Sequence, residues 1–169
     1  ARAMLGTGEV AGKTSALSSR GVGVAYAASG VTLSGAYQTF KDTNQRTLDG
    51  ATLGAAYQWN TVRLAANAAR SEAETAVGKH TVQRVFSAGT TWSVTPLFDL
   101  TAAYYKVDRT RTGAADDGYG RLVAFAEYKL SRRTKVYAEL DSTRWRNGFQ
   151  GAANKATATG VSAGVVHTF

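Results

Sequence analysis

Few residues in this chain belong to the types that usually carry out chemistry in proteins. Its 169 residues include no cysteine and only two histidines, His80 and His167. The lack of cysteine excludes a disulfide framework, a thiolate zinc site and a cysteine nucleophile. The sequence contains no serine-hydrolase elbow, zinc-protease motif, phosphate-binding loop or dinucleotide-binding turn. We therefore expect no cofactor, no metal and no catalytic centre.

The charged residues are more informative. Lys and Arg number 20 and Asp and Glu number 12, so the net charge is +8. Such a balance favours acidic partners, namely nucleic acid, anionic lipid or small anions. A nucleic-acid site needs a basic stripe with exposed stacking aromatics, whereas bases and acids are intermixed here. We therefore expect no nucleic-acid partner, and a soluble basic binding module is the third-ranked interpretation.

Apolar and polar residues alternate along most of the chain, which predicts β-strands with one apolar and one polar face. The clearest examples are residues 31–38, 51–59, 61–68, 121–130 and 134–142. Short connections lie at residues 29–30, 60, 94–96 and 131–133, and long polar ones near residues 41–49, 70–79, 109–118 and 146–155. This rhythm predicts an antiparallel up-and-down sheet of nine clear strands and a tenth near the N-terminus. We expect a single β-barrel domain over residues 1–169, or the C-terminal portion of one.

Such a sheet can be a soluble barrel with its apolar face inside or a transmembrane barrel with that face outside. The predicted strands of about 9–13 residues match the tilted strands that cross a bilayer. The chain has no isoleucine, and its apolar faces of Ala, Val, Leu and Gly are thin for a soluble core. The sequence therefore predicts an all-β, transmembrane, antiparallel up-and-down β-barrel.

Aromatic residues lie near the ends of the predicted strands, as in the two belts that flank a membrane. The predicted belt residues are Tyr26, Trp59, Trp92, Phe98 and Tyr128 near short turns, and Trp145 near a long loop.

If the apolar face meets lipid, the polar face lines a lumen. The predicted lumen charges are Arg63, Arg121, Lys129, Lys135, Glu127 and Glu139. A charge on the lipid side at the bilayer centre would cost about 2–4 kcal/mol. Rings of Arg and Lys favour anions, although pairing with the carboxylates would make these bases part of the wall scaffold. Alternation leaves the direction of Arg84 and Lys106 open.

The end of the chain suggests a family. Phe169 closes an alternating strand and shares a face with His167, which resembles the C-terminal signature that the barrel-assembly machinery of Gram-negative bacteria recognises. The ending HTF, GEVAG at 8–12 and SRGVGVAYAASGVTLSGAYQ at 19–38 resemble the β-proteobacterial trimeric porins. Phe169 and His167 are therefore the predicted assembly signal.

This resemblance implies a homotrimer in the bacterial outer membrane, in contact with its lipid, with long loops extracellular and short turns periplasmic. It implies passive diffusion of small ions and hydrophilic solutes, and the basic lumen adds an anion preference. The porins that this chain resembles are 16-stranded barrels about twice as long. The chain thus looks like the C-terminal part of one, without the loop that narrows the pore, or like a smaller related barrel.

The alternative is a ten-stranded outer-membrane barrel that acts as a protease or adhesin through its long loops. Outer-membrane proteases of the omptin type use Asp/His pairs at the loop end, which makes His80 the candidate residue. Nothing in the spacing supports such a pair, so we expect no enzyme, and a solvated loop histidine is the simpler interpretation.

Overall fold

The computed structural model describes residues 1–7, 16–151 and 154–169. Within this part of the chain every regular element is a strand. The strands are β1 (Arg2–Gly6), β2 (Ser19–Ala28), β3 (Val31–Lys41), β4 (Thr47–Trp59), β5 (Val62–Ala76), β6 (Lys79–Thr95), β7 (Phe98–Arg111), β8 (Asp117–Lys129), β9 (Thr134–Arg146) and β10 (Thr157–His167). None of the described residues belongs to a helix that is long and apolar enough to cross a membrane.

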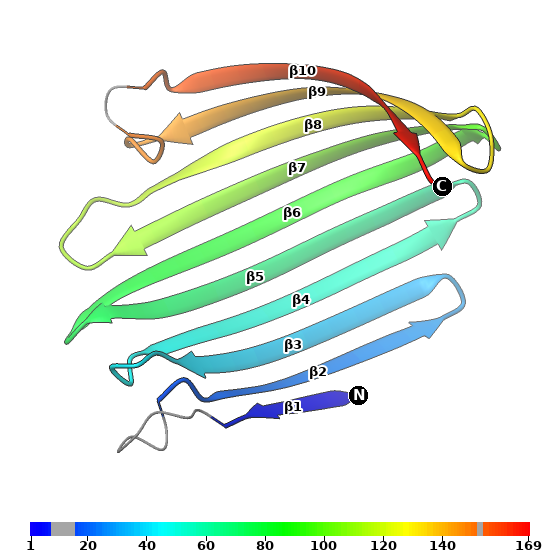
Figure 1. Ribbon diagram of the computed structural model, residues 1–169. Coiled ribbons are helices and arrows are strands. Elements are labelled where there is room, and N and C mark those ends of the chain that lie inside the picture. Colours follow the sequence, from blue (N-terminus) through cyan, green and yellow to red (C-terminus); the bar gives the residue numbers. More distant parts are fainter. Residues whose placement is uncertain (8–15, 152–153) are drawn as a thin grey trace.

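The ten strands form one curved sheet in which each strand pairs with its neighbours in sequence (Figure 1). All nine pairings are antiparallel. The predicted up-and-down arrangement, including the tenth strand near the N-terminus, is confirmed. Among the described residues β1 and β10 do not pair with each other, so the sheet is an open wall rather than a closed ring.

Tight turns join the strands at one end of the sheet because the chain there adopts left-handed backbone conformations. Ser29 and Gly30 both have positive φ, at 51° and 79°, as a two-residue hairpin turn requires. Asn60, in the turn between β4 and β5, has a φ of 50°, and asparagine is one of the few side chains that tolerate this region. These turns lie where the sequence predicted short connections.

The long connection predicted at residues 70–79 is wrong. Strands β5 and β6 have 15 and 17 residues and continue through this segment. Only Val77 and Gly78 remain between them, with Gly78 at a φ of 68°. Polar residues occupy both faces there, so the apolar alternation ends while the backbone pairing continues. Backbone hydrogen bonds do not depend on side-chain polarity, so the strands extend beyond the alternating segments that predicted them.

The packing of the two faces decides between the soluble and the membrane interpretation. Among the described residues, only Ala16 and Val107 are buried hydrophobic side chains. Leu53, in the middle of β4, is 68% exposed, and Val161 on β10 is 80% exposed. A soluble fold would bury such residues. A continuous apolar face without a core to cover it is the mark of a wall that faces lipid.

Candidate functional site

The polar side chains of β4 to β9 lie together on the other face of the sheet, which we call the polar wall. Register places on it Thr52, Arg63, Asn67, Ser87, Thr91, Asp99, Thr101, Tyr105, Arg121, Glu127, Lys129, Lys135, Glu139 and Asp141. Side-chain contacts join neighbouring strands across it. Asn67 donates a 2.9 Å hydrogen bond to Thr52, and the Phe125 and Tyr137 rings stack at 5.5 Å. All six predicted lumen charges therefore share one surface.

Most charges of the polar wall are paired. The Nζ of Lys129 lies 2.7 Å from Asp99, and that of Lys135 lies 2.9 Å from Glu127. Arg121 lies 3.2 Å from Asp141 and 3.8 Å from Glu139. These side chains are partly solvated, so each pair stabilises the wall only modestly. Pairing removes most of the net field that the four bases would otherwise create, as the scaffold interpretation expected.

Arg63 differs from the other bases. It is exposed, and no ion pair reaches it from any residue that the structure describes. Its cross-strand neighbours are Gln58 on β4 and Thr91 on β6. Arg63 lines a hollow of about 230 Å³ together with Asn67 and Tyr105. The polar wall therefore presents an unneutralised guanidinium in a hollow lined by both polar and small apolar residues, which suits the approach of a small anion.

A second basic group lies at the long-loop end of the polar wall. Arg109 donates two hydrogen bonds to Asp117, of 2.8 and 2.6 Å, and Arg111 lies 2.6 Å from the same carboxylate. The ring of Phe149 covers Arg109, with its centroid 4.2 Å from the guanidinium carbon. Two cations share one buried carboxylate, so one positive charge remains. The sequence predicted a loop at residues 109–118, whereas β7 continues to Arg111; the alternation of Arg109 and Arg111 was the signal for this continuation.

Five of the six predicted belt aromatics lie on the apolar face near the tight turns. They are Tyr26, Trp59, Trp92, Phe98 and Tyr128, and the rings of Phe98 and Tyr128 are 6.4 Å apart on adjacent strands. The prediction for Trp145 is wrong. Trp145 pairs with Tyr119 and has the parity of Asp141, which places it on the polar wall. Its position near a loop end did not reveal which face it occupies.

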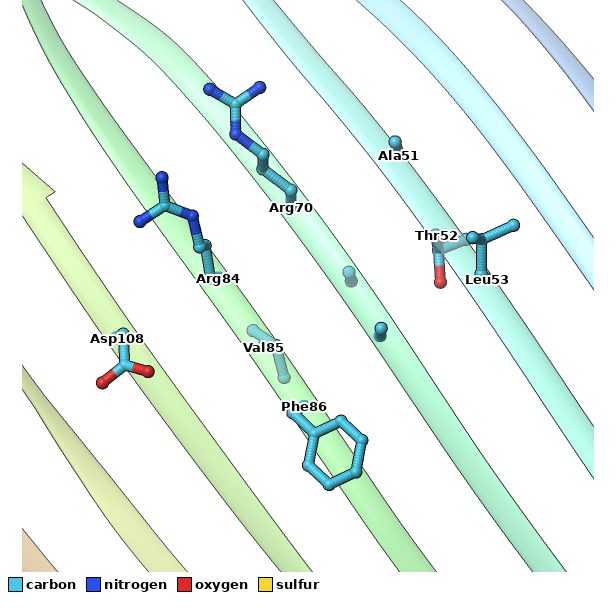
Figure 2. A pocket seen from close by; sticks show the side chains of 10 residues that line it. Ala51, Thr52, Leu53, Arg70, Arg84, Val85, Phe86 and Asp108 are labelled. Atoms are coloured by element: carbon cyan, nitrogen blue, oxygen red, sulfur yellow. The ribbon is translucent and has the colours of Figure 1, made fainter.

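Arg84 and Lys106 both lie on the apolar face. Arg84 is opposite Arg70 on one side and Asp108 on the other, and Lys106 is opposite Phe86. Figure 2 shows the guanidinium groups of Arg70 and Arg84 extending away from Phe86. Long basic side chains on a lipid-facing surface are stable in this way, with the stem on apolar atoms and the charge at the interface.

The two histidines are in simple surroundings. Nδ1 of His80 lies 3.4 Å from Glu72, and the His80 side chain is 46% exposed. Within the described ranges, no group of three or more His, Asp or Glu side chains could hold a metal ion. His167 packs edge-on against Phe169 at 4.8 Å, and its Nδ1 is 2.9 Å from Thr134. The assembly-signal role of these two residues stays a prediction.

Comparison with solved structures finds the same fold. The anion-selective porin from Comamonas acidovorans has a TM-score of 0.79 and 20% identity, over 92% of this chain and 50% of that chain. OmpT of Vibrio cholerae, an outer-membrane protein, has a TM-score of 0.74 and 14% identity, over 88% of this chain and 55% of that one. The chain thus spans about half the length of these structures. A search of curated sequences finds no match.

The sequence itself carries the family signal. The family model described as Gram-negative porin matches residues 1–148, which is most of the chain. This match agrees with the apolar outer face, the row of aromatics and the charged polar wall of an up-and-down sheet. The chain belongs to the Gram-negative porin family.

Proposed function

We propose that this chain forms part of the wall of an outer-membrane channel through which small hydrophilic solutes diffuse passively. The observation that carries the proposal is the division of one sheet into an exposed apolar face and a charged polar wall. A lipid-facing exterior and a water-facing interior need that division. No bond is made or broken in such a function, so it needs no catalytic residue and no cofactor.

The channel prefers anions over cations. Among the described residues Arg63 has no carboxylate partner, and Arg109 and Arg111 share Asp117. The paired bases contribute little, so selectivity depends on these three arginines. A narrow, low-dielectric channel concentrates a small excess of positive charge into a useful potential. The structural likeness to an anion-selective porin supports the same preference.

The complete assembly is proposed from the family. The chain supplies the C-terminal strands of a 16-stranded barrel, and three barrels form a homotrimer. The long loops are extracellular and the tight turns are periplasmic. The machinery that assembles outer-membrane barrels recognises Phe169 together with His167. The two similar solved structures support the larger barrel, because each of these proteins is about twice as long as this chain.

Planar-bilayer recording of the protein from outer membranes tests the function. We expect stepwise conductance and a reversal potential that favours chloride in a KCl gradient. Arg63→Glu should reduce or invert the anion preference without loss of the channel, because Arg63 makes no ion pair within the described part of the chain. Arg132→Glu, the same charge change in a tight turn outside the polar wall, is the matched control.

The channel function and the anion preference are contradicted by different results. Absence of conductance steps in correctly folded protein would contradict the channel itself. A cation-selective wild type would contradict the anion preference, and equal shifts in both variants would remove Arg63 from the explanation. The protease alternative is not proposed, because the carboxylate beside His80 is Glu72, and both residues have the parity of the apolar face.

A further inference from the structure

The apolar face carries a group of cations near the long-loop end of β7 and β9. Two rows of residues cross β8 there, and each row has a glycine at its centre. The first row is Asp108, Gly118 and Arg146, and the second, two residues nearer the tight turns, is Lys106, Gly120 and Arg144.

The first row contains its own ion pair. Arg146 extends over Gly118, which has no side chain, and forms an ion pair with Asp108 on the far side. Lys106 approaches the same carboxylate at 3.3 Å. One carboxylate thus serves two cations.

The second row has the same arrangement but lacks an anion. Lys106 on β7 and Arg144 on β9 flank Gly120 on β8, so the two cationic residues are about 10 Å apart at the backbone. Arg144 is exposed, and its side chain has no ion pair or hydrogen bond to any of the residues in the described ranges. The hydroxyl of Tyr104 lies over Gly120, 2.7 Å from the position that a Cβ would occupy. The Tyr104 hydroxyl thus occupies the space over Gly120, between Arg144, which has no carboxylate partner among the described residues, and Lys106, which shares Asp108 with Arg146.

A hollow of about 590 Å³ contains this row and is lined by Tyr104, Lys106, Gly120, Leu122, Ser142 and Arg144, among others. A second hollow of about 540 Å³ lies beneath it on the same face. Its lining includes Leu100, Ala102, Ala124, Leu140 and Val161, and it is almost wholly apolar. The row of Ala102, Ala124 and Leu140 is four residues from the row of Lys106, so the two sites are about 13 Å apart.

We propose that this surface binds a phosphate-bearing lipid of the membrane leaflet at the long-loop end. The phosphate binds Arg144, Lys106 and the Tyr104 hydroxyl. It provides in the second row the negative charge that Asp108 provides in the first. The acyl chains lie in the apolar hollow over the small side chains of β7 and β8. A phosphate with several oxygens can accept hydrogen bonds from two cations and a hydroxyl at once. A free anion would leave the apolar hollow unused.

Native mass spectrometry of the detergent-solubilised protein tests the proposal. The probe is phosphatidic acid, and diacylglycerol with the same acyl chains is the comparison without phosphate. We expect phosphatidic acid to bind more tightly than diacylglycerol. Arg144→Gln should weaken it about tenfold, as expected for loss of one charged hydrogen-bond donor. The double variant K106Q/R144Q should bind the two lipids alike.

Two further variants make the test specific. Gly120→Asp supplies an internal carboxylate between the cations, and the flexible end of Tyr104 can move to accommodate it, so it should also abolish the preference for phosphate. Arg63→Gln removes the same charge from the opposite face and should leave lipid binding unchanged. Conductance of Arg144→Gln should stay at the wild-type value, so this result is independent of the proposed channel.

Four outcomes would overturn the proposal. Equal binding of the two lipids by wild-type protein would exclude a phosphate site, and equal losses in Arg144→Gln and Arg63→Gln would exclude a site on this face. Displacement of phosphatidic acid by an equal concentration of inorganic phosphate would indicate a site for a free anion. A lower oligomer mass in Arg144→Gln would assign the surface to contacts between copies of the chain.

Discussion

Lys129 and Lys135 lie directly opposite each other on β8 and β9, and each is neutralised by a carboxylate one row away. Their partners, Asp99 and Glu127, are themselves opposite each other on β7 and β8. We call these four residues the charge square: its two ion pairs join unlike charges on adjacent strands, and its two directly opposed pairs are of like charge. Directly opposed like charges destabilise a strand pair, so the square depends on all four residues.

Removing one corner of this square should raise anion preference. In Asp99→Asn, Lys129 loses its partner and faces Lys135 without compensation. We expect the reversal potential to shift toward chloride and the unfolding free energy in detergent to fall by about 0.2–1 kcal/mol. A reversal potential identical to wild type would mean that this square does not contact the permeating ions.

The buried carboxylate at the loop end should matter more for stability. Asp117 is 2% exposed and serves Arg109 and Arg111, so Asp117→Asn leaves two guanidinium groups without an anion. Because both arginines are partly solvated, we expect a loss of about 1–3 kcal/mol, measured by urea unfolding in detergent micelles. Asp116→Asn changes the exposed neighbouring carboxyl and should be close to neutral, and equal losses in both variants would contradict a special role for Asp117.

The assignment of the two faces can be tested with adjacent alanines in the middle of β4. Ala55 lies on the apolar face opposite Leu33, and Ala56 lies on the opposite face next to Thr32. Ala55→Arg should lower stability in lipid vesicles by about 2–4 kcal/mol, whereas Ala56→Arg should cost far less because it faces water. The two variants are compared by the fraction of folded protein in vesicles as a function of urea concentration. The reverse order of the two losses would mean that the lipid-facing and water-facing sides have been exchanged.

The tight turns should respond to the conformation rather than to the polarity of their residues. Gly30 has a φ of 79° and its absent Cβ would lie 2.9 Å from the Gln58 carbonyl oxygen. Gly30→Val should therefore destabilise the β2–β3 hairpin by about 1 kcal/mol or more. Gly50→Val, at a strand glycine where a Cβ has room, is the control for the change in size. Equal refolding rates and stabilities for the two variants would contradict the argument from backbone strain.

The fold class, the number of strands and the faces of the central segments could be predicted from local sequence. Leu53 and Thr52 follow each other in an alternating run, and a two-residue period assigns their faces without reference to any partner. The tight turns at Ser29-Gly30 and Asn60 were also local, because backbone conformation there depends on one or two residues. These properties need no contact between distant parts of the chain.

The positions and partners of the charges became clear only from the pairing of distant strands. Near the long-loop ends of the strands both faces are polar, so alternation no longer distinguishes the lipid-facing side from the polar wall. The direction of Arg84 follows from its pairing with Asp108, and that of Trp145 from its pairing with Tyr119. The partner of Lys129 is 30 residues away at Asp99, and Lys106 and Arg144 flank Gly120 only because the register of β7, β8 and β9 aligns them. Strand register brings these residues together, and register is set by the whole sheet rather than by any one segment.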